Sequence, residues 1–444
     1  MIDEREIEAL RRRLERIRIR TDSAWLAEEG RPLLASIDEL LQHSVALTFP
    51  LPASDVLALH RFMTTAVDRL EEWLPDARRN ELAGKFFAGF ALRLYLLSTM
   101  TRIVLPPGFW RLLTQLGHAY ADKEPVRGEL AWLFALAAAD PRFMDGKELL
   151  WALRWIQSAS PVIALYGSGQ SQEDGFVMSL SLDEPPEPRA WFFGRENAPR
   201  ATLFFSLEEL AKRAEEEIHL LEGGGWATRR HQEGGLSADG RAALLRELLD
   251  RWRYGWQRRL PRKPFDAMAE LLVGWEAVLS HRLGLPATIH PVRVTDVSIS
   301  GYELRWTDNE GPIFFPGQIV AIRVVGDVRW VLALVRWLRQ HPNGLQMGIQ
   351  ALGFDPEPVA LGQEKPLPAG TSAQMALSVR KAPPLRLQSA LVCTKGTVCG
   401  PKLVEASESA VGKWLLRQVH FIRFEAQTRD VEVFQFEVDP FMED

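Results

Sequence analysis

The chain has 444 residues, of which 46% are hydrophobic and 25% are charged, a composition typical of a folded globular protein rather than a disordered one. This length exceeds what one ordinary hydrophobic core serves and favours roughly two to four domains. The formal net charge of −5 argues against general binding of nucleic acids, which requires a basic protein surface.

Residues 1–160 are predicted to form a helical domain, because apolar side chains recur there at helical spacing between proline and glycine breaks. Its most apolar segment, residues 86–105, contains Arg93 and Arg102. An arginine inside such a segment makes membrane insertion costly, so we expect a buried helix and no membrane insertion. Since the charged N-terminus lacks the pattern of a signal peptide, we expect a cytoplasmic protein.

Residues 161–288 are predicted to be of mixed structure. Short apolar runs divided by turn residues predict a small β element over residues 161–205. From Ser206 onward, a capping pattern and helical spacing predict helices that end in a basic, arginine-rich stretch. The segment that follows this stretch, residues 265–284, is also predicted to be helical.

From residue 289 the pattern changes to strands. It predicts a strand-rich unit over residues 289–355, a Pro/Gly-rich linker over 356–370 and a second small β unit over 371–444. Cys393 and Cys399 fall in the last unit and are expected to be reduced thiols, because no histidine pair nearby completes a zinc site. The expected fold class is therefore α+β, with a helical N-terminal region followed by two β units.

The most informative motif is the run Asp296-Val-Ser298-Ile-Ser-Gly301, between two segments of β-type alternation. It places a carboxylate, a hydroxyl and a turn glycine at fixed offsets, and a short polar turn between apolar strands often forms a small-molecule site. The same residues are also compatible with an Asx-type turn that binds no ligand.

Three stretches resemble a PilZ domain, a small antiparallel β-barrel: VTDVSISGYELRW, FPGQIVAIRV and WVLALVRWLRQHPNGLQMGIQALG. The acid, hydroxyl and glycine of the turn match the family's Asp/Asn-x-Ser-x-x-Gly motif. The third stretch resembles the family's closing strands at Arg336, Trp337, Gly344 and Gly348. The resemblance implies a PilZ-like barrel over residues 289–355 and a receptor for the bacterial messenger cyclic di-GMP, with no other cofactor.

The family's first motif, Arg-x-x-x-Arg, is matched by Arg258 and Arg262, with Arg259 between them. Guanidinium groups suit this chemistry, because they bind phosphates and the O6 and N7 atoms of guanine in a bidentate manner. Arg12 and Arg16 show the same spacing in a plainly helical segment. The gap between the arginines and the turn is also longer than is usual in the family, so either a helix is inserted or these arginines are unrelated to the barrel.

Two further arginines, Arg293 and Arg305, flank the turn; they either supply charge to the same pocket or simply face solvent. The sequence contains no zinc-protease motif, nucleophile elbow or P-loop, so we expect a protein that is not an enzyme, with no catalytic residue and no metal site. Two functions remain open. One is a cyclic di-GMP receptor that relays the signal to a protein partner through its helical region; the other is a scaffold with a degenerate barrel that binds no nucleotide.

Overall fold

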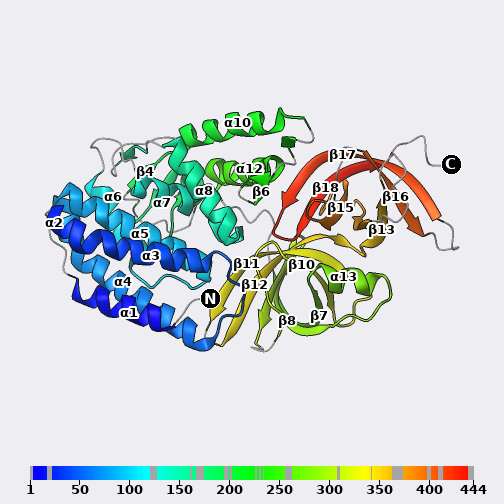
Figure 1. The fold of residues 1–444 in the computed structure, drawn as a ribbon, viewed down its shortest axis with the longest axis horizontal. Helices are drawn as coiled ribbons and strands as arrows, with labels where there is room; N and C mark the ends of the chain where they lie inside the picture. Colours follow the sequence, from blue (N-terminus) through cyan, green and yellow to red (C-terminus); the bar gives the residue numbers. More distant parts are fainter. Residues whose placement is uncertain are drawn as a thin grey trace. The chain divides into compact units, whose positions relative to one another are not determined.

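The structure is a computed structural model, which describes residues 4–17, 23–120, 128–160, 163–166, 175–194, 200, 203–225, 228–229, 232–233, 235–255, 263–307, 311–341, 343–362, 374–397, 402–408 and 414–438. The chain forms two compact units (Figure 1). We call the first the helical unit; it consists of Met1–Glu216, Leu245–Gln257 and Arg339–Asn343. The second, the barrel unit, consists of Glu217–Leu244, Arg258–Leu338 and Gly344–Asp444.

The helical unit begins with a series of helices, which confirms the predicted helical region. Their bounds are α1 (Glu4–Arg16), α2 (Ser23–Trp25), η1 (Leu26–Gly30), α3 (Arg31–Ser44), α4 (Ala53–Arg79), α5 (Glu81–Thr101), α6 (Phe109–Ala119), α7 (Glu129–Ala138), η2 (Pro141–Phe143) and α8 (Gly146–Ala159). Helix α5 is the buried helix expected from the sequence. Arg93 is accommodated there because its Nε and Nη2 donate to the two carboxylate oxygens of Asp38 at 2.8 and 2.9 Å. None of the helices described by the structure is long and apolar enough to cross a membrane.

A small antiparallel sheet completes this unit, as expected for the first β element. Its strands follow the order β1-β4-β2-β3, with bounds β1 (Leu165–Tyr166), β2 (Phe176–Met178), β3 (Glu187–Pro188) and β4 (Leu203–Phe205). Helices α9 (Arg189–Gly194), α10 (Glu208–Glu222) and α12 (Ala238–Tyr254) follow, with the short hairpin β5 (Gln232–Glu233) and β6 (Leu236–Ser237) before α12. Helix α12 belongs to both units, since its residues up to Leu244 are part of the barrel unit and those from Leu245 are part of the helical unit.

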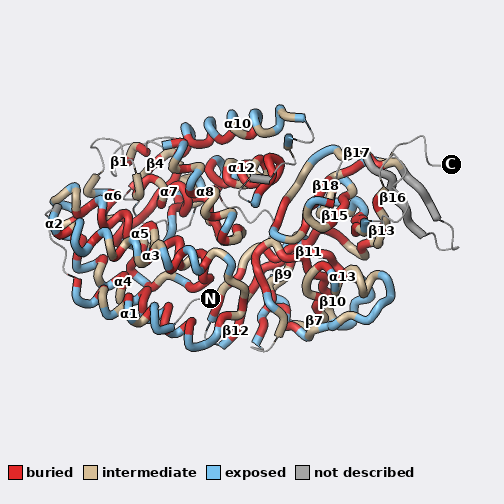
Figure 2. Tube along the Cα trace, viewed as in Figure 1, coloured by how far each residue is buried: buried red, intermediate tan, exposed pale blue. Residues whose placement is uncertain are grey.

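The barrel unit contains a closed antiparallel barrel with strand order β10-β11-β12-β9-β8-β7. The strands are β7 (Lys263–Val273), β8 (His290–Ser298), β9 (Gly301–Trp306), β10 (Ile319–Val324), β11 (Val331–His341) and β12 (Gly344–Phe354). Alternate side chains fill the interior and are fully buried, among them Val294, Leu304, Val320, Ile322, Ala333 and Met347. The buried positions along β11 are visible in Figure 2.

The prediction of a continuous helix over residues 265–284 was wrong for its first half. The chain forms strand β7 up to Val273, and only helix α13 (Trp275–Arg282) follows, after Gly274 with φ 87°. Strand β7 pairs with both β8 and β10 and so closes the barrel. Its residues include several good helix formers, and sheet pairing overrides that local preference.

A second closed antiparallel barrel follows, with strand order β13-β14-β15-β18-β17-β16. Its strands are β13 (Glu357–Gly362), β14 (Gln374–Val379), β15 (Ser389–Thr394), β16 (Lys402–Glu408), β17 (Trp414–Gln427) and β18 (Val431–Val438). Strand β13 therefore occupies the beginning of the expected linker, because Val359 and Leu361 turn inward to the core of this barrel. The division of the chain into five segments otherwise stays a prediction.

The two barrels share one strand connectivity. In each barrel the first strand pairs with the second and the second with the third. The third pairs with the sixth, the sixth with the fifth, the fifth with the fourth, and the fourth with the first, which closes the barrel. Their outer faces also share one hydrophobic cluster, in which α13 contributes Trp275 and Val278, the first barrel contributes residues such as Leu332, and the second contributes residues such as Leu377. A fully buried side chain of this size contributes about 1.5–3 kcal/mol, so the cluster fixes the two barrels to each other.

Candidate functional site at the β8–β9 turn

Asp296, Ser298 and Gly301 lie around the turn that joins β8 to β9. Strand β8 ends at Ser298 and β9 begins at Gly301, and these two residues pair in the ladder. The Ser298 hydroxyl lies 3.2 Å from the Ser300 hydroxyl and donates to the carbonyl oxygen of Gly301 at 3.3 Å. The turn is thus closed by its own hydroxyl groups.

Gly301 is required here because β12 approaches its backbone closely. Its φ is 156°, and a Cβ atom at this position would lie 1.9 Å from the carbonyl oxygen of Ile349. On the same side, Ala351 N donates to the carbonyl oxygen of Ser300 at 2.9 Å. The motif glycine therefore lets β12 hold the turn in place, and no other residue type fits without a shift of the backbone.

Asp296 is half-buried at a point where both neighbouring ladders change register. It pairs with Pro264 on β7 and with Glu303 on β9, and irregularities lie between Pro264 and Ala267 and between Val294 and Asp296. Such bulges redirect side chains and are frequent beside binding sites. Asp296, the acid of the motif, therefore lies where the regular strand pairing of β8 is interrupted.

The closing strands pack on the same side of the barrel as the turn. Gly348 pairs with Glu303, and a Cβ atom on Gly348 would lie 2.0 Å from Nε1 of Trp337, so the indole rests directly on this glycine. Gly344 begins β12 with φ 135°, and a Cβ atom there would lie 2.3 Å from the carbonyl oxygen of Trp306. At both glycine positions of the predicted closing pattern, a side chain would therefore collide with a neighbouring residue.

The segment built from these elements matches a known family. Residues 280–358 match the family model described as the middle PilZ domain of the cyclic-di-GMP receptor FimW. The match runs from inside α13 through β8–β12 to the start of β13, so it includes the turn and the closing strands. Residues 280–358 form a PilZ domain. No curated protein matches the chain significantly.

The PilZ barrel also uses β7, which precedes the matched residues. Lys263 pairs with Val297 and Pro264 pairs with Asp296, so the beginning of β7 lies beside the motif turn. The predicted ligand-binding arginines Arg258, Arg259 and Arg262 lie outside the described residues. Since Lys263 directly follows Arg262 in the sequence, the arginine stretch leads straight into the first strand, and the extra helix, α13, is inserted after that strand.

Polar residues that the sequence did not single out surround Asp296 in the PilZ domain. Gln346 Nε2 donates to Glu303 Oε1 at 2.6 Å, and the Thr295 hydroxyl donates to the same oxygen at 3.2 Å. Glu303 is thereby fixed opposite Asp296. The signal that identifies Glu303 is its place two residues after Gly301 in an alternating strand, but Gln346 comes from a strand far along the chain.

The arginines that flank the turn face solvent. Arg293 donates to both carboxylate oxygens of Asp266, each at 2.6 Å, and these hydrogen bonds lower the pKa of Asp266 and raise the pKa of Arg293. Arg305 pairs with Arg293 across the ladder and is exposed. The charge of Arg293 is therefore already neutralised by a carboxylate, and the solvent-facing alternative holds for both residues.

The remaining sequence-level candidates lie away from the turn. Cys393 is buried in the core of the second barrel, and Cys399 lies outside the described residues. Among the residues that the structure describes, no group of three or more His, Cys, Asp or Glu side chains is arranged to hold a metal ion. The described side chains of the motif at the PilZ turn are a carboxylate, Asp296, and a hydroxyl, Ser298, which are hydrogen-bonding groups.

Proposed function

We propose that this chain is a cyclic di-GMP receptor whose ligand is bound between the β8–β9 turn and the arginine stretch 258–262. One observation carries the proposal: β7 begins directly after Arg262 and pairs with Val297 and Asp296. Consecutive Cα atoms are about 3.8 Å apart and an arginine side chain is longer than that, so we expect the guanidinium group of Arg262 to reach the turn. Membership of residues 280–358 in a family of cyclic di-GMP receptors supports the same ligand.

The side chains of the arginine stretch and of the turn suit different groups of cyclic di-GMP. The guanidinium groups of Arg258 and Arg262 would bind the phosphates and the O6 and N7 atoms of guanine. Asp296 and Ser298 would hydrogen-bond the guanine edge, with Gly301 leaving room for the close turn. Binding alone accounts for this role, so we propose that the chain is not an enzyme and that it acts in the bacterial cytoplasm, where it responds to this messenger.

A relay to the helical unit follows from the chain connectivity. The arginine stretch lies between Gly255, just past α12, and Lys263 at the start of β7. The end of α12 is held within the helical unit, because Trp252 Nε1 donates to the carbonyl oxygen of Ala135 at 2.9 Å and Arg251 donates to that of Ala139 at 2.9 Å. A ligand that binds the stretch would therefore bias α12, and a protein partner would detect this change through the helical unit.

The direct test is calorimetric titration of the full-length protein with cyclic di-GMP. We expect Arg262→Ala and Asp296→Ala to weaken binding about tenfold or more each, because each removes a charged hydrogen-bonding group. Arg293→Ala is the matched control, since Arg293 lies near the turn but is paired with Asp266, and it should bind like the unmodified protein. Absence of binding at tens of micromolar ligand would leave the scaffold with a degenerate barrel as the better function.

The relay is tested by hydrogen exchange of the same protein with and without cyclic di-GMP. Binding should slow amide exchange in α12 residues 245–254 as well as in β8 and β9. Arg262→Ala should abolish both effects. Slowed exchange confined to β8 and β9 would retain the receptor and remove the relay through α12.

A further inference from the structure

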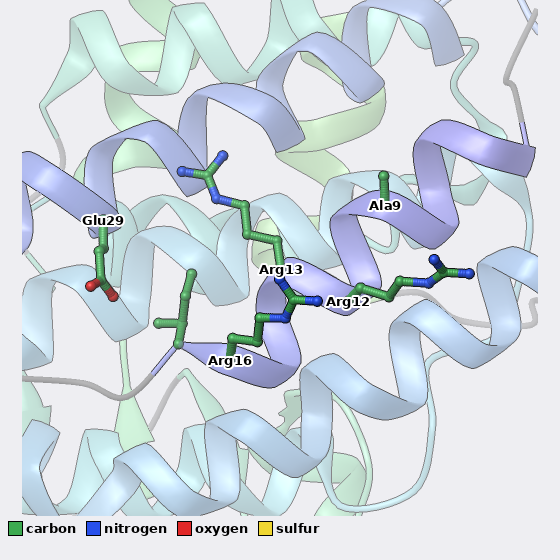
Figure 3. A pocket seen from close by; sticks show the side chains of 6 residues that line it. Ala9, Arg12, Arg13, Arg16 and Glu29 are labelled. Carbon is green, nitrogen blue, oxygen red and sulfur yellow. The ribbon is translucent and has the colours of Figure 1, made fainter.

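Helix α1 borders an open hollow at the surface of the helical unit (Figure 3). Its volume is about 450 Å³, within the range of ligand pockets. Three of the residues that line it are arginines on two successive turns of α1, and Glu29 of η1 lies at its other side; the lining residues are Ala9, Arg12, Arg13, Arg16, Ile17 and Glu29. The hollow lies in the helical unit, whereas the β8–β9 turn belongs to the barrel unit.

Within the described residues the three arginines form no ion pair with a carboxylate, although the charge of Arg12 contributes to lowering the pKa of Glu8. On the opposite side of α1, Arg11 is paired with Glu8 at 2.8 Å and also with Glu15. In the described parts of the chain, no carboxylate forms an ion pair with Arg12, Arg13 or Arg16. Arg13 Nη1 donates to the Ser36 hydroxyl at 3.2 Å, which leaves its charge uncompensated.

This arrangement is unfavourable for the isolated helix. Arg12 and Arg16 are four residues apart, and Arg13 and Arg16 are three apart, spacings at which like charges repel on a helix. A position in the last turn favours cations through the helix dipole and accounts for Arg13 and Arg16 individually. The dipole does not require three arginines around one hollow, and an anion bound there would neutralise all of them.

The number of guanidinium groups indicates the class of anion. Elsewhere in this protein a carboxylate is satisfied by one arginine through two hydrogen bonds, as in the pairs Arg93–Asp38 and Arg253–Glu215. A phosphate group carries nearly two negative charges and three or more acceptor oxygens, and so matches several arginines. Among the described residues that line the hollow none is aromatic, so they offer no surface on which a nucleobase could stack.

We propose that Arg12, Arg13 and Arg16 form a binding site for a phosphate group, supplied either by a phosphorylated protein side chain or by a small phosphate ester. Glu29 limits the site on the far side, with its carboxylate held by a hydrogen bond from Trp25 Nε1 at 3.1 Å. This acid disfavours a second anionic group beside the phosphate. The site acts independently of cyclic di-GMP.

The test is calorimetric titration of the full-length protein with inorganic phosphate, pyrophosphate, acetate, and a phosphoserine peptide beside its unphosphorylated form. The double variant Arg12→Gln/Arg16→Gln should bind phosphate at least about tenfold more weakly than the unmodified protein. Arg11→Gln/Arg61→Gln is the matched control: it removes the same charge from the face where both arginines lie near Glu8. This control should retain phosphate binding.

Each outcome decides the proposal. Tighter binding of the phosphopeptide than of inorganic phosphate assigns the group to a protein partner, and the reverse assigns it to a small phosphate ester. The proposal is overturned if no phosphate compound binds, if acetate binds as tightly as phosphate, or if both double variants lose binding equally. Thermal unfolding of all variants verifies that the exposed substitutions leave the fold intact.

Discussion

The two barrels of the barrel unit share their strand connectivity but differ at the connection between the second and third strands. In the PilZ barrel this is the tight β8–β9 turn, which contains the acid, the hydroxyl and the glycine of the motif. In the second barrel, residues 380–388 form a longer loop, which contains neither an acid nor a glycine. One barrel topology therefore accommodates two very different connections at the same place, and the proposed ligand site depends on the one in the PilZ barrel.

The second barrel uses an arginine of its loop for structure instead. Arg386 Nε donates to the carbonyl oxygen of Leu352 on β12 at 2.9 Å, and its Nη2 donates to Glu425 on β17 at 2.7 Å. The loop also closes on itself through backbone hydrogen bonds between Ala382 and Arg386. This arginine therefore ties the second barrel to the PilZ barrel through its Nε and Nη2 atoms, while its buried Nη1 has no hydrogen-bond partner among the described residues.

The largest expected effect concerns the number of cyclic di-GMP binding sites in the two barrels. If only the PilZ turn binds cyclic di-GMP, Asp296→Ala/Ser298→Ala should reduce affinity about hundredfold or more, with no residual saturable site. Calorimetry of this double variant measures both affinity and stoichiometry. Arg386→Ala in the second barrel should leave cyclic di-GMP affinity unchanged. Residual stoichiometric binding in the double variant would show that the second barrel binds the nucleotide too.

The shared hydrophobic cluster predicts that the two barrels unfold together. Leu377 and Leu391 are both fully buried, but Leu377 fills the shared cluster while Leu391 lies inside the second barrel. Either leucine changed to alanine should lower the free energy of unfolding by about 2–5 kcal/mol. Hydrogen exchange should show faster opening of β10–β12 in Leu377→Ala and a smaller change there in Leu391→Ala. Equal protection of β10–β12 in both variants would contradict the coupling.

Two glycines test whether the PilZ turn is sterically special. An added Cβ atom meets no atom within 4 Å at Gly396, in the turn after β15, whereas at Gly301 it meets the backbone of β12. Gly396→Ala should cost about 1–2 kcal/mol, because its φ of 82° is unfavourable for alanine. Gly301→Ala should cost about 1–3 kcal/mol more than that from overpacking, and it should also weaken cyclic di-GMP binding. Chemical denaturation measures the free energy of unfolding of both variants. Similar losses of stability in the two would show that β12 moves aside freely.

The sequence predicted the motif turn and the closing strands well because their signals are local. Gly301, Gly344 and Gly348 each occupy a position where another backbone or a ring excludes a side chain, and such positions depend on residue type. Glu303 and Gln346 were missed because the strand register brings them beside Asp296, and register is not visible in a short stretch of sequence.

Strand β7 was missed for a different reason. Leu271 lies on the inner face of the PilZ barrel, while Leu272 lies on the outer face and is buried in the cluster shared with the second barrel. A strand that is buried on both faces loses the polar–apolar alternation that identifies it. This accounts for the end of β7, where Ala269, Leu271 and Leu272 are buried, whereas residues 263–266 are exposed and show no alternation of buried and exposed positions.

The smallest expected effect is a pH dependence at the boundary between the barrels. His281 lies on α13, and its ring centroid is 4.8 Å from that of Trp330, a member of the shared cluster. Partial burial lowers the pKa of His281 below its ordinary value of 6.5, and the nearby charges of Arg282 and Arg323 act in the same direction, against the weaker opposing effect of Glu270. The folded protein therefore binds this proton less readily than the unfolded chain does.

The sign of the pH effect follows from this difference. The stabilising contribution is present above pH 6.5, where the histidine is neutral in both states, and it is lost as the pH falls through 6.5 and then through the lower pKa of the folded state. His281→Gln keeps a polar side chain of similar size but cannot titrate. Urea denaturation across this range should therefore show a steeper loss of stability on acidification in the unmodified protein than in the variant. Parallel curves would mean that α13 releases His281 to solvent, and that the contact with Trp330 does not help to hold the two barrels together.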